Sequence, residues 1–193
     1  EKEGCPIHLT IITKQEEINQ EYKDKIDRSN CIELFEFGMD KVQLNEFYKR
    51  AAILLHPTRW DSYALVVLEA IKYGCAVITT DLYALKEMVE DGENGYVFKP
   101  YYREWNEDNT PNFEVKYHHK DTILSGFVDE SLIENMYTVL KKLAADRNHL
   151  KNLCINSYEK AVNGKFSEKV IAGMWENLLE DINGNVRNRN LEL

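Results

Sequence analysis

Leu-Leu-His-Pro-Thr-Arg-Trp-Asp-Ser-Tyr-Ala-Leu-Val-Val-Leu-Glu, residues 54–69, is the stretch of sequence that decides the fold. A short apolar run ends at His56, and Pro57 cannot continue a strand in a sheet because it lacks a backbone N–H group. A polar loop follows as far as Ser62, and a nearly apolar helix is predicted to begin around Tyr63. A strand, a polar loop and a buried helix in this order are typical of one unit of an α/β fold.

Four further short apolar segments lie on either side of this unit, and segments of helical length separate several of them. Because strands that alternate with helices pair in parallel, we expect a Rossmann-like, doubly wound open parallel sheet with flanking helices. The predicted strands are 7–13, 31–37, 52–56, 76–80 and 96–98, and the predicted helices between them are 14–28, 43–50 and 63–73.

The second half of the chain has a helical character. Three helices are predicted within 129–182, and the first is 131–145, with Ser131 and Glu134 at the spacing of a capping box. The other two are 147–162 and 168–182. Ser167 is the expected N-cap of the last helix.

An apolar stripe on the last helix predicts a face that packs into the core, and Trp175 is assigned to this packing rather than to binding. The stripe consists of Ile171, Met174, Trp175, Leu178 and Ile182.

Residues 101–126 show neither the periodicity of a helix nor that of a strand. They form a long loop insertion between the α/β half of the chain and its helical half. A loop of this length is usually functional or disordered. Two readings therefore stay open: a solvated excursion with some aromatic side chains folded back onto the surface, and a lid or acceptor-contact role. His118 and His119 are not a metal signal by themselves, because adjacent residues on a strand point to opposite faces.

Composition excludes several classes of protein. The 193 residues can form one domain with its own core. A net charge of −9 without a block of Lys or Arg argues against nucleic acid or anionic lipid as a general partner. The longest apolar run, 64–68, is far shorter than the roughly 20 residues of a membrane span.

The cysteines and the N-terminal residues indicate in which cellular compartment the protein is expected and whether the sequence is part of a longer one. The four cysteines are scattered without a CxxC pair or histidines at zinc spacing, so we expect no metal site, and a reducing cytoplasm is the simplest location. No secretion signal is visible and the sequence does not begin with Met, which suggests that it starts partway through a longer gene product.

The junction between the polar loop and the helix at 63–73 is a candidate anion site. Ligands of open α/β sheets bind at the carboxyl ends of the strands, where a helix N-terminus presents free N–H groups and the positive end of its dipole. The N–H groups near Tyr63, Ala64 and Leu65 could hold a phosphate without any lysine.

Glu69 is the only charged residue between Ser62 and Ile71, on a helix whose other residues look buried. A carboxylate in that setting is costly unless it accepts hydrogen bonds, either from a protein donor or from a ligand. A vicinal diol suits it, because one carboxylate can accept both hydroxyls. Asp61 places a second carboxylate at the mouth of the same helix, which favours the ligand.

The run 56–81 resembles the donor-binding segment of retaining glycosyltransferases of the GT-B fold, the group 1 or GT4-like set. The family pattern there has two Glu residues separated by seven others, with Phe-Gly-Leu between them, then Glu-Ala, a Gly before a small residue, and Val-Ile. The resemblance continues at 89–97, and 32–38 is similar to the strand ending in Gly that faces the nucleotide base. It covers most of 7–100 and, more loosely, the terminal helices.

The resemblance implies a role for particular residues. Glu69 would hold the ribose hydroxyls, Asp61 would contact the transferred sugar as the catalytic residue, and Met39 would lie against the base through its backbone. The start of the helix would contact phosphate and sugar, through a set formed by Ser62, Tyr63, Ala64 and Leu65.

The implied reaction is metal-independent transfer of a hexose, with retention, from a nucleotide-diphospho-sugar to a glycan or lipid-linked acceptor, without a further cofactor. In this reading residues 1–193 are a single nucleotide-sugar-binding domain, the C-terminal half of a GT-B enzyme whose N-terminal acceptor domain is absent. The isolated chain is then expected to be inactive, and the full-length protein to be cytoplasmic, with a place at the membrane surface left open.

The sequence departs from the family pattern at several positions. Asp61 is one methylene shorter than the family's Glu, and Ala64 replaces a Gly, which is tolerable only if no positive φ is needed. The family's Gly-Gly falls within Leu-Tyr-Ala at 82–84, where close approach of a ligand is not expected. The Arg and Lys that neutralise pyrophosphate in the family have no counterpart here.

Two other functions stay open. A sugar-nucleotide epimerase of GT-B architecture would need its own acid and base, for which His56 is the only candidate on the correct side of the sheet. A non-catalytic nucleotide-sugar-binding module would explain the altered motif. Trp60 either lines the sugar pocket or packs within its loop.

Overall fold

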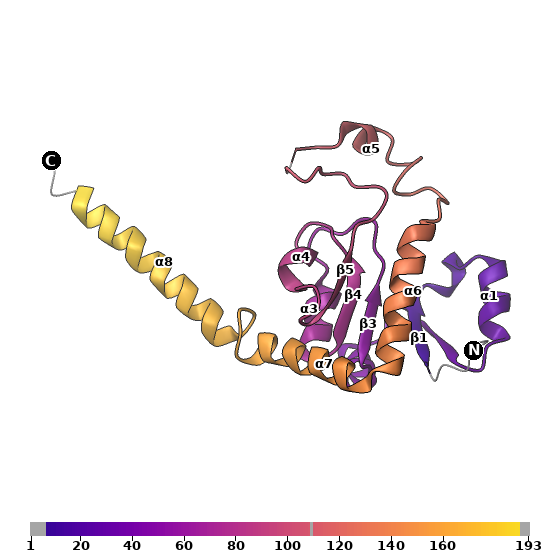
Figure 1. Ribbon diagram of the computed structural model, residues 1–193. Helices are drawn as coiled ribbons and strands as arrows, with labels where there is room; N and C mark the ends of the chain where they lie inside the picture. Colours follow the sequence, from indigo (N-terminus) through magenta and orange to yellow (C-terminus); the bar gives the residue numbers. More distant parts are fainter. Residues whose placement is uncertain (1–6, 109, 190–193) are drawn as a thin grey trace.

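The computed structural model describes residues 7–108 and 110–189 (Figure 1). Strands alternate with helices along the first half, as the apolar segments predict, and every strand pairing is parallel. The strands are β1 (Leu9–Thr13), β2 (Ile32–Glu36), β3 (Ile53–His56), β4 (Ala76–Thr80) and β5 (Gly95–Phe98). The predicted α/β class with parallel strands and flanking helices is therefore confirmed.

The described strands form two sheets. In one, β1 pairs with β2, and in the other the order is β3-β4-β5. No ladder of backbone hydrogen bonds in the described part of the chain joins the two sheets, so the single open sheet of the prediction is divided.

Helices connect the strands and then make up the second half. The first group is η1 (Gln15–Glu17), α1 (Gln20–Asp27), α2 (Lys41–Arg50), α3 (Leu65–Lys72) and α4 (Leu85–Met88). The second group is α5 (Phe113–Tyr117), α6 (Glu130–Ala145), α7 (Arg147–Val162) and α8 (Glu168–Arg189). The sequence did not predict α4 and α5, because helices of four and five residues are too short to show a period.

The core lies on both faces of β4, all five residues of which are buried. Alternate residues of a strand point to opposite faces, so Val77 packs with α3 and α4 while Ala76 and Ile78 pack with α6 and α7. Figure 1 shows α3 and α4 on one side of this sheet and α6 on the other. Burial on two faces explains why β4 is an unbroken apolar run in the sequence up to Thr79.

The helix caps match the predictions in part. Ser167 accepts a hydrogen bond from the N–H group of Val170 at 3.3 Å, as expected of the N-cap of α8. The predicted capping box of α6 is wrong, because Asp129 is the N-cap and accepts from the N–H group of Leu132 at 3.0 Å. The Ser131 hydroxyl donates to the same carboxylate.

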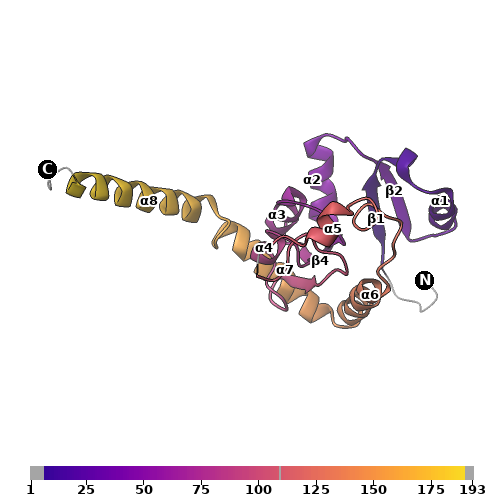
Figure 2. The same cartoon turned by 90° about the horizontal axis from the view of Figure 1, so that it is seen from above.

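Helix α8 leaves the sheets and extends away from them (Figures 1 and 2). Trp175 is 61% exposed, so the prediction that it packs in the core is wrong. The other residues of the apolar stripe are also exposed. Periodicity shows which residues share a face of a helix, but it does not show what covers that face. None of the described helices combines the length and apolar character needed to cross a membrane.

One ion-pair cluster joins the turn before β5 to the C-terminal helices and predicts a pH dependence of stability. Hydrogen bonds from Lys160 and Lys165 lower the pKa of Glu90 to about 2. A lowered pKa stabilises the folded state above the unfolded value of about 4.5, and this contribution is lost as the pH falls toward 2. Glu90 is 45% exposed, so solvent screening reduces the effect to about 1 kcal/mol.

We therefore expect Glu90→Gln to lower the free energy of unfolding at pH 7 by about 1 kcal/mol and to leave it unchanged near pH 2. Urea unfolding at both pH values measures this, with the exposed Glu16→Gln as the matched control. Equal losses at the two pH values would contradict an ionic origin.

Candidate functional site

The carboxyl ends of β3 and β4 carry the candidate site. The loop 57–64 follows β3 and the loop 81–84 follows β4, and the insertion 101–126 crosses over both from the end of β5 (Figure 1). This is the edge of a parallel sheet where ligands of α/β proteins bind.

Asp61 closes the N-terminus of α3. Its Oδ1 accepts hydrogen bonds from the N–H groups of Tyr63 at 3.1 Å and Ala64 at 2.7 Å. Two of the three N–H groups predicted to hold a phosphate are thus bonded to a carboxylate of the chain. Asp61 Oδ2 lies 3.6 Å from His56 Nε2. Burial lowers the pKa of His56, and the charge of Asp61 opposes part of that shift.

Ala64 has a φ of +48°, in the left-handed region that favours glycine. The condition under which Ala64 could replace the family's Gly without strain is therefore not met. A left-handed residue other than glycine costs about 1–2 kcal/mol. Ala64 is buried with Val67 and Ile71, so the packing of its methyl group offsets part of this cost.

Glu69 lies on the second turn of α3, where Tyr48 of α2 binds it. The Tyr48 hydroxyl donates to Glu69 Oε2 at 3.2 Å, and its ring is buried and stacked on Tyr73. Burial, and then the charge of Glu69, raises the pKa of Tyr48, so the hydroxyl stays a donor. In the described part of the chain Tyr48 is the only hydrogen-bond donor to this carboxylate, which leaves Oε1 able to accept from a ligand.

The other residues of the predicted set follow β2 or lie at the start of α3. Met39 follows Gly38, which has a φ of +97°, at the carboxyl end of β2, and it is half-buried. The side chains of Ser62, Tyr63 and Leu65 are exposed, so the expected contacts of this stretch with phosphate and sugar depend on its backbone.

A pocket of about 470 Å³ opens beside the start of α3. We call it the Trp60–Trp105 pocket, and its lining consists of Trp60, Asp61, Ser62, Tyr83, Glu104 and Trp105. It brings together Asp61 and Ser62 of the predicted set, but not Glu69 or Met39. Trp60 is 59% exposed and lines this pocket, so it is not packed within its own loop.

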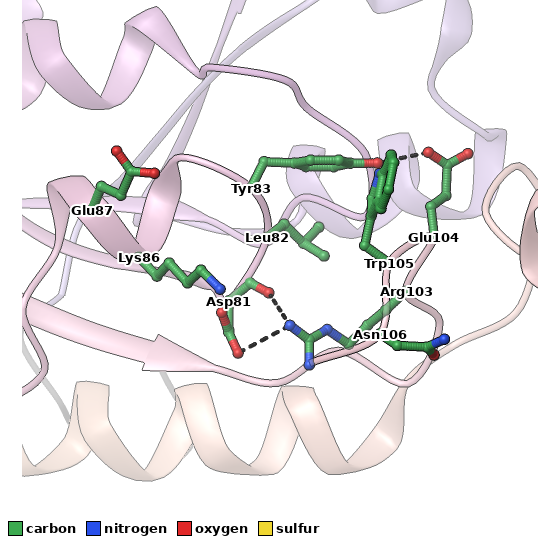
Figure 3. A pocket seen from close by; sticks show the side chains of 9 residues that line it. All are labelled: Asp81, Leu82, Tyr83, Lys86, Glu87, Arg103, Glu104, Trp105 and Asn106. Atoms are coloured by element: carbon green, nitrogen blue, oxygen red, sulfur yellow. Dashed lines mark hydrogen bonds and ion pairs between the residues drawn. The ribbon is translucent and has the colours of Figure 1, made fainter. Parts of the chain in front are cut away.

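An adjacent pocket of about 200 Å³ shares Tyr83, Glu104 and Trp105 with the first (Figure 3). Its remaining lining includes Asp81 and Arg103, and Arg103 donates to both the carbonyl and the carboxylate of Asp81 at 3.2 Å. In the described residues no group of three or more His, Cys, Asp or Glu side chains could hold a metal ion.

The insertion 101–126 is anchored to the site at a few points. The Arg59 guanidinium donates to the carbonyl oxygens of Ile123, Ser125 and Phe127. Ile123 itself is buried, as is Val115. Most of the described residues of the insertion are nevertheless exposed, so these contacts do not decide between the two readings.

Sequence reasoning missed Tyr83 and Glu104 as site residues. Tyr83 has a φ of +46°, and its hydroxyl donates to Glu104 Oε2 at 2.6 Å. The replacement of the family's Gly-Gly by Leu-Tyr-Ala was the available signal for Tyr83. No signal in the sequence pointed to Glu104. Its segment has neither helical nor strand periodicity, and its hydrogen bond with Tyr83 joins residues 21 positions apart.

Comparison with known proteins gives the family. The sequence model described as "Glycosyl transferases group 1" matches residues 2–108, more than half of the chain. An uncharacterised 41.2 kDa protein in the cps region of Klebsiella pneumoniae is 33% identical over 72 residues. The lipopolysaccharide core biosynthesis mannosyltransferase LpsB of Rhizobium meliloti is 26% identical over 72 residues. Each match covers 37% of this chain, which spans about one fifth of the length of these curated relatives.

Solved structures share the fold at low sequence identity. Anabaena Alr3699/HepE in complex with UDP has a TM-score of 0.59 at 17% identity, covering 91% of this chain and 42% of that one. The C-terminal domain of a glycosyl transferase group 1 family protein (LpcC) from Francisella tularensis has a TM-score of 0.53 at 20% identity, covering 74% and 59%. The chain therefore belongs to the group 1 glycosyl transferases, and its Rossmann-like parallel architecture is of their GT-B type.

Proposed function

We propose that this chain is the C-terminal, donor-binding domain of a retaining, GT4-like glycosyltransferase, and that it binds a nucleotide-diphospho-sugar at the carboxyl ends of β2, β3 and β4. The observation that carries the proposal is the presence of two carboxylates at one helix, one in the loop that caps its N-terminus and one on its second turn. Asp61 caps the N-terminus of α3, and Glu69 lies one turn further with one oxygen free to accept.

Each part of the donor has a place in this arrangement. The ribose hydroxyls donate to Glu69, and the base lies against the backbone at Met39. The pyrophosphate takes the N–H groups of Tyr63, Ala64 and Leu65, where the helix dipole favours an anion. The phosphate displaces Asp61 Oδ1 from two of them, and repulsion between the two anions moves this carboxylate toward the sugar.

Backbone dipoles then stabilise the negative charge that develops on the leaving phosphate, so the reaction needs no divalent ion. Asp61, the catalytic residue of the proposal, contacts the hexose as the glycosidic bond breaks. The acceptor, a glycan or a lipid-linked sugar, is held by a further domain of the full-length protein. We place that protein in the cytoplasm, at the membrane surface if its acceptor is lipid-linked.

The names of similar proteins support this assignment. HepE was solved with UDP, with UDP-glucose, and with UDP and glucose, and the pneumococcal O-GlcNAc transferase GtfA with UDP and GlcNAc. The Rhizobium relative is a mannosyltransferase of lipopolysaccharide core biosynthesis. Each of these names contains UDP, a sugar or both, which supports a nucleotide sugar as the donor of the proposed reaction.

Calorimetric titration with UDP, GDP and ADP tests the proposal. We expect one of them to bind with a dissociation constant of about 0.1–1 mM, to raise the melting temperature, and to bind equally well in EDTA. Absence of binding by all three would overturn the proposal, and dependence on a divalent ion would overturn its metal-independent form.

A product assay on the full-length protein separates the remaining alternatives. A new glycosidic bond supports the transferase. An epimerised donor would instead support the epimerase, for which the contact of His56 with Asp61 at 3.6 Å supplies a histidine–carboxylate pair. Binding of the donor without turnover by any acceptor would indicate a non-catalytic module.

A further inference from the structure

The Trp60–Trp105 pocket has the composition of a site for a neutral, polyhydroxylated ligand. Two carboxylates, of Asp61 and Glu104, lie among three aromatic side chains and one serine, and no Lys or Arg lines it. Carboxylates accept hydrogen bonds from hydroxyl groups but repel phosphate. The lining therefore suits the sugar of a donor and not its pyrophosphate.

Glu104 is held in place before any ligand binds. Its Oε2 accepts from the Tyr83 hydroxyl at 2.6 Å, and its Oε1 lies 3.2 Å from His119 Nε2. Its backbone is fixed as well, because its carbonyl accepts from the N–H group of Asn112 at 2.7 Å. The side chain is 16% exposed, and a carboxylate has about four acceptor positions, so it can still bind hydroxyl groups.

Two tryptophans give the pocket an apolar surface. Trp60 is 59% exposed and Trp105 is 40% exposed, so both rings present accessible surface to the pocket that they line. The Trp60 ring is in edge contact with His119, at a centroid distance of 5.4 Å. Figure 3 shows the Trp105 ring at the hydroxyl end of Tyr83, close to Glu104. The C–H face of a pyranose ring can pack on aromatic surfaces of this kind.

The pocket also adjoins the place that the proposed function gives to the pyrophosphate. Asp61 lines it and at the same time caps α3, so the pocket begins at the N–H groups that the proposed function gives to the pyrophosphate.

We propose that the insertion 101–126 forms the second wall of the donor's sugar pocket, with Glu104 as a specificity-determining residue and Trp105 as the surface on which the pyranose ring packs. This inference rests on the proposed function. According to this inference, the contacts between the insertion and the loop that carries Tyr83 make the protein prefer an uncharged hexose over a negatively charged sugar.

Binding of UDP and UDP-glucose to the 193-residue chain and its variants tests the inference, by calorimetry. We expect the native chain to bind UDP-glucose about tenfold more tightly than UDP. Glu104→Gln and Trp105→Phe should each remove most of this difference and leave the affinity for UDP within twofold of native. Glu107→Gln and Trp175→Phe are matched controls outside the pocket, and they should change neither affinity.

A charged sugar provides a readout that a purely structural role would not move. Glu104 should make UDP-glucuronic acid bind more weakly than UDP-glucose, and Glu104→Gln should bring the two affinities closer together. The inference is overturned if both pocket variants bind UDP-glucose like the native chain, or if they lose UDP and UDP-glucose equally.

Failure of the two proposals can be told apart. If the native chain binds none of the nucleotides, the donor site itself is absent and both proposals fall. If UDP binds but the pocket variants keep the preference for UDP-glucose, the proposed function stands and the role of the insertion is wrong.

Discussion

Replacement of Glu69 by alanine is expected to weaken the binding of UDP about 100-fold. The change removes the acceptor for the two ribose hydroxyls, and hydrogen bonds to a charged group contribute about 1.5–3 kcal/mol each. A loss of about 3 kcal/mol corresponds to a factor of roughly 100 in the dissociation constant. The Tyr48 hydroxyl also loses its partner, but Tyr48 donates to Oε2 in the free protein as well, so this loss mainly affects stability.

The prediction has a specific readout in the nucleotide. If Glu69 binds the ribose diol, the native chain should prefer UDP over 2′-deoxy-UDP, and Glu69→Ala should abolish this preference. Titration followed by NMR chemical-shift changes, which reports binding in the millimolar range and weaker, measures it with both nucleotides. A variant that binds weakly but keeps the preference would show that Glu69 acts on the fold and not on the ribose.

Tyr48→Phe is the matched control for this experiment. It keeps the carboxylate and removes only the protein donor at 3.2 Å, so we expect UDP to bind within about threefold of native. Glu46→Ala, on the exposed side of α2, removes a carboxylate that pairs with Lys49 and should leave UDP binding unchanged. Loss of binding in either control would indicate a general disturbance of α2 and α3.

The parts of the fold that the sequence predicts are those with a strong local pattern. The five strands and α7 follow from apolar runs and helical spacing, since each pattern is complete within its own segment. The expected site at the end of β3 follows from the same reasoning, because Pro57 ends the strand and the apolar helix begins soon after Ser62.

The parts that could not be predicted depend on long-range contacts or on backbone angles. Ala and Tyr rarely adopt the left-handed conformation found at Ala64 and Tyr83, so the only signal for it was the glycine that the family has at or near these positions. The bonds from Arg59 to 123–127 join segments more than sixty residues apart. A periodic pattern carries no information on such contacts, which is why the second wall of the pocket was missed.

Gly95→Ala is expected to destabilise the protein by at least about 3 kcal/mol. A Cβ atom at this position would lie 1.9 Å from the carbonyl oxygen of Val77 and 2.9 Å from Val89 Cγ1. Val77 is the partner of Gly95 in the β4–β5 ladder and is fully buried, so its backbone cannot move without breaking that ladder. For a chain of this length the loss corresponds to a fall in melting temperature of about 6–12 °C.

Gly126→Ala is the matched control, because no atom lies within 4 Å of the added Cβ and the residue has no positive φ. It should leave the unfolding free energy within about 1 kcal/mol of native, on the stabilising side, since alanine restricts the unfolded chain. Urea unfolding followed by circular dichroism measures both variants. Equal stability of Gly95→Ala and the native chain would mean that β5 does not lie as close to β4 as the structure places it.

Gly95→Ala also links the stability of the fold to the candidate site. The close approach of β5 to β4 fixes the point at which the insertion begins, where Asp81 accepts a bond from Arg103 and Tyr83 donates one to Glu104. Displacement of β5 should therefore reduce the preference for UDP-glucose over UDP at temperatures where the Gly95→Ala variant is still folded. Binding of UDP should persist there, because Glu69 and the start of α3 precede β4 in the chain and keep their own contacts with α2.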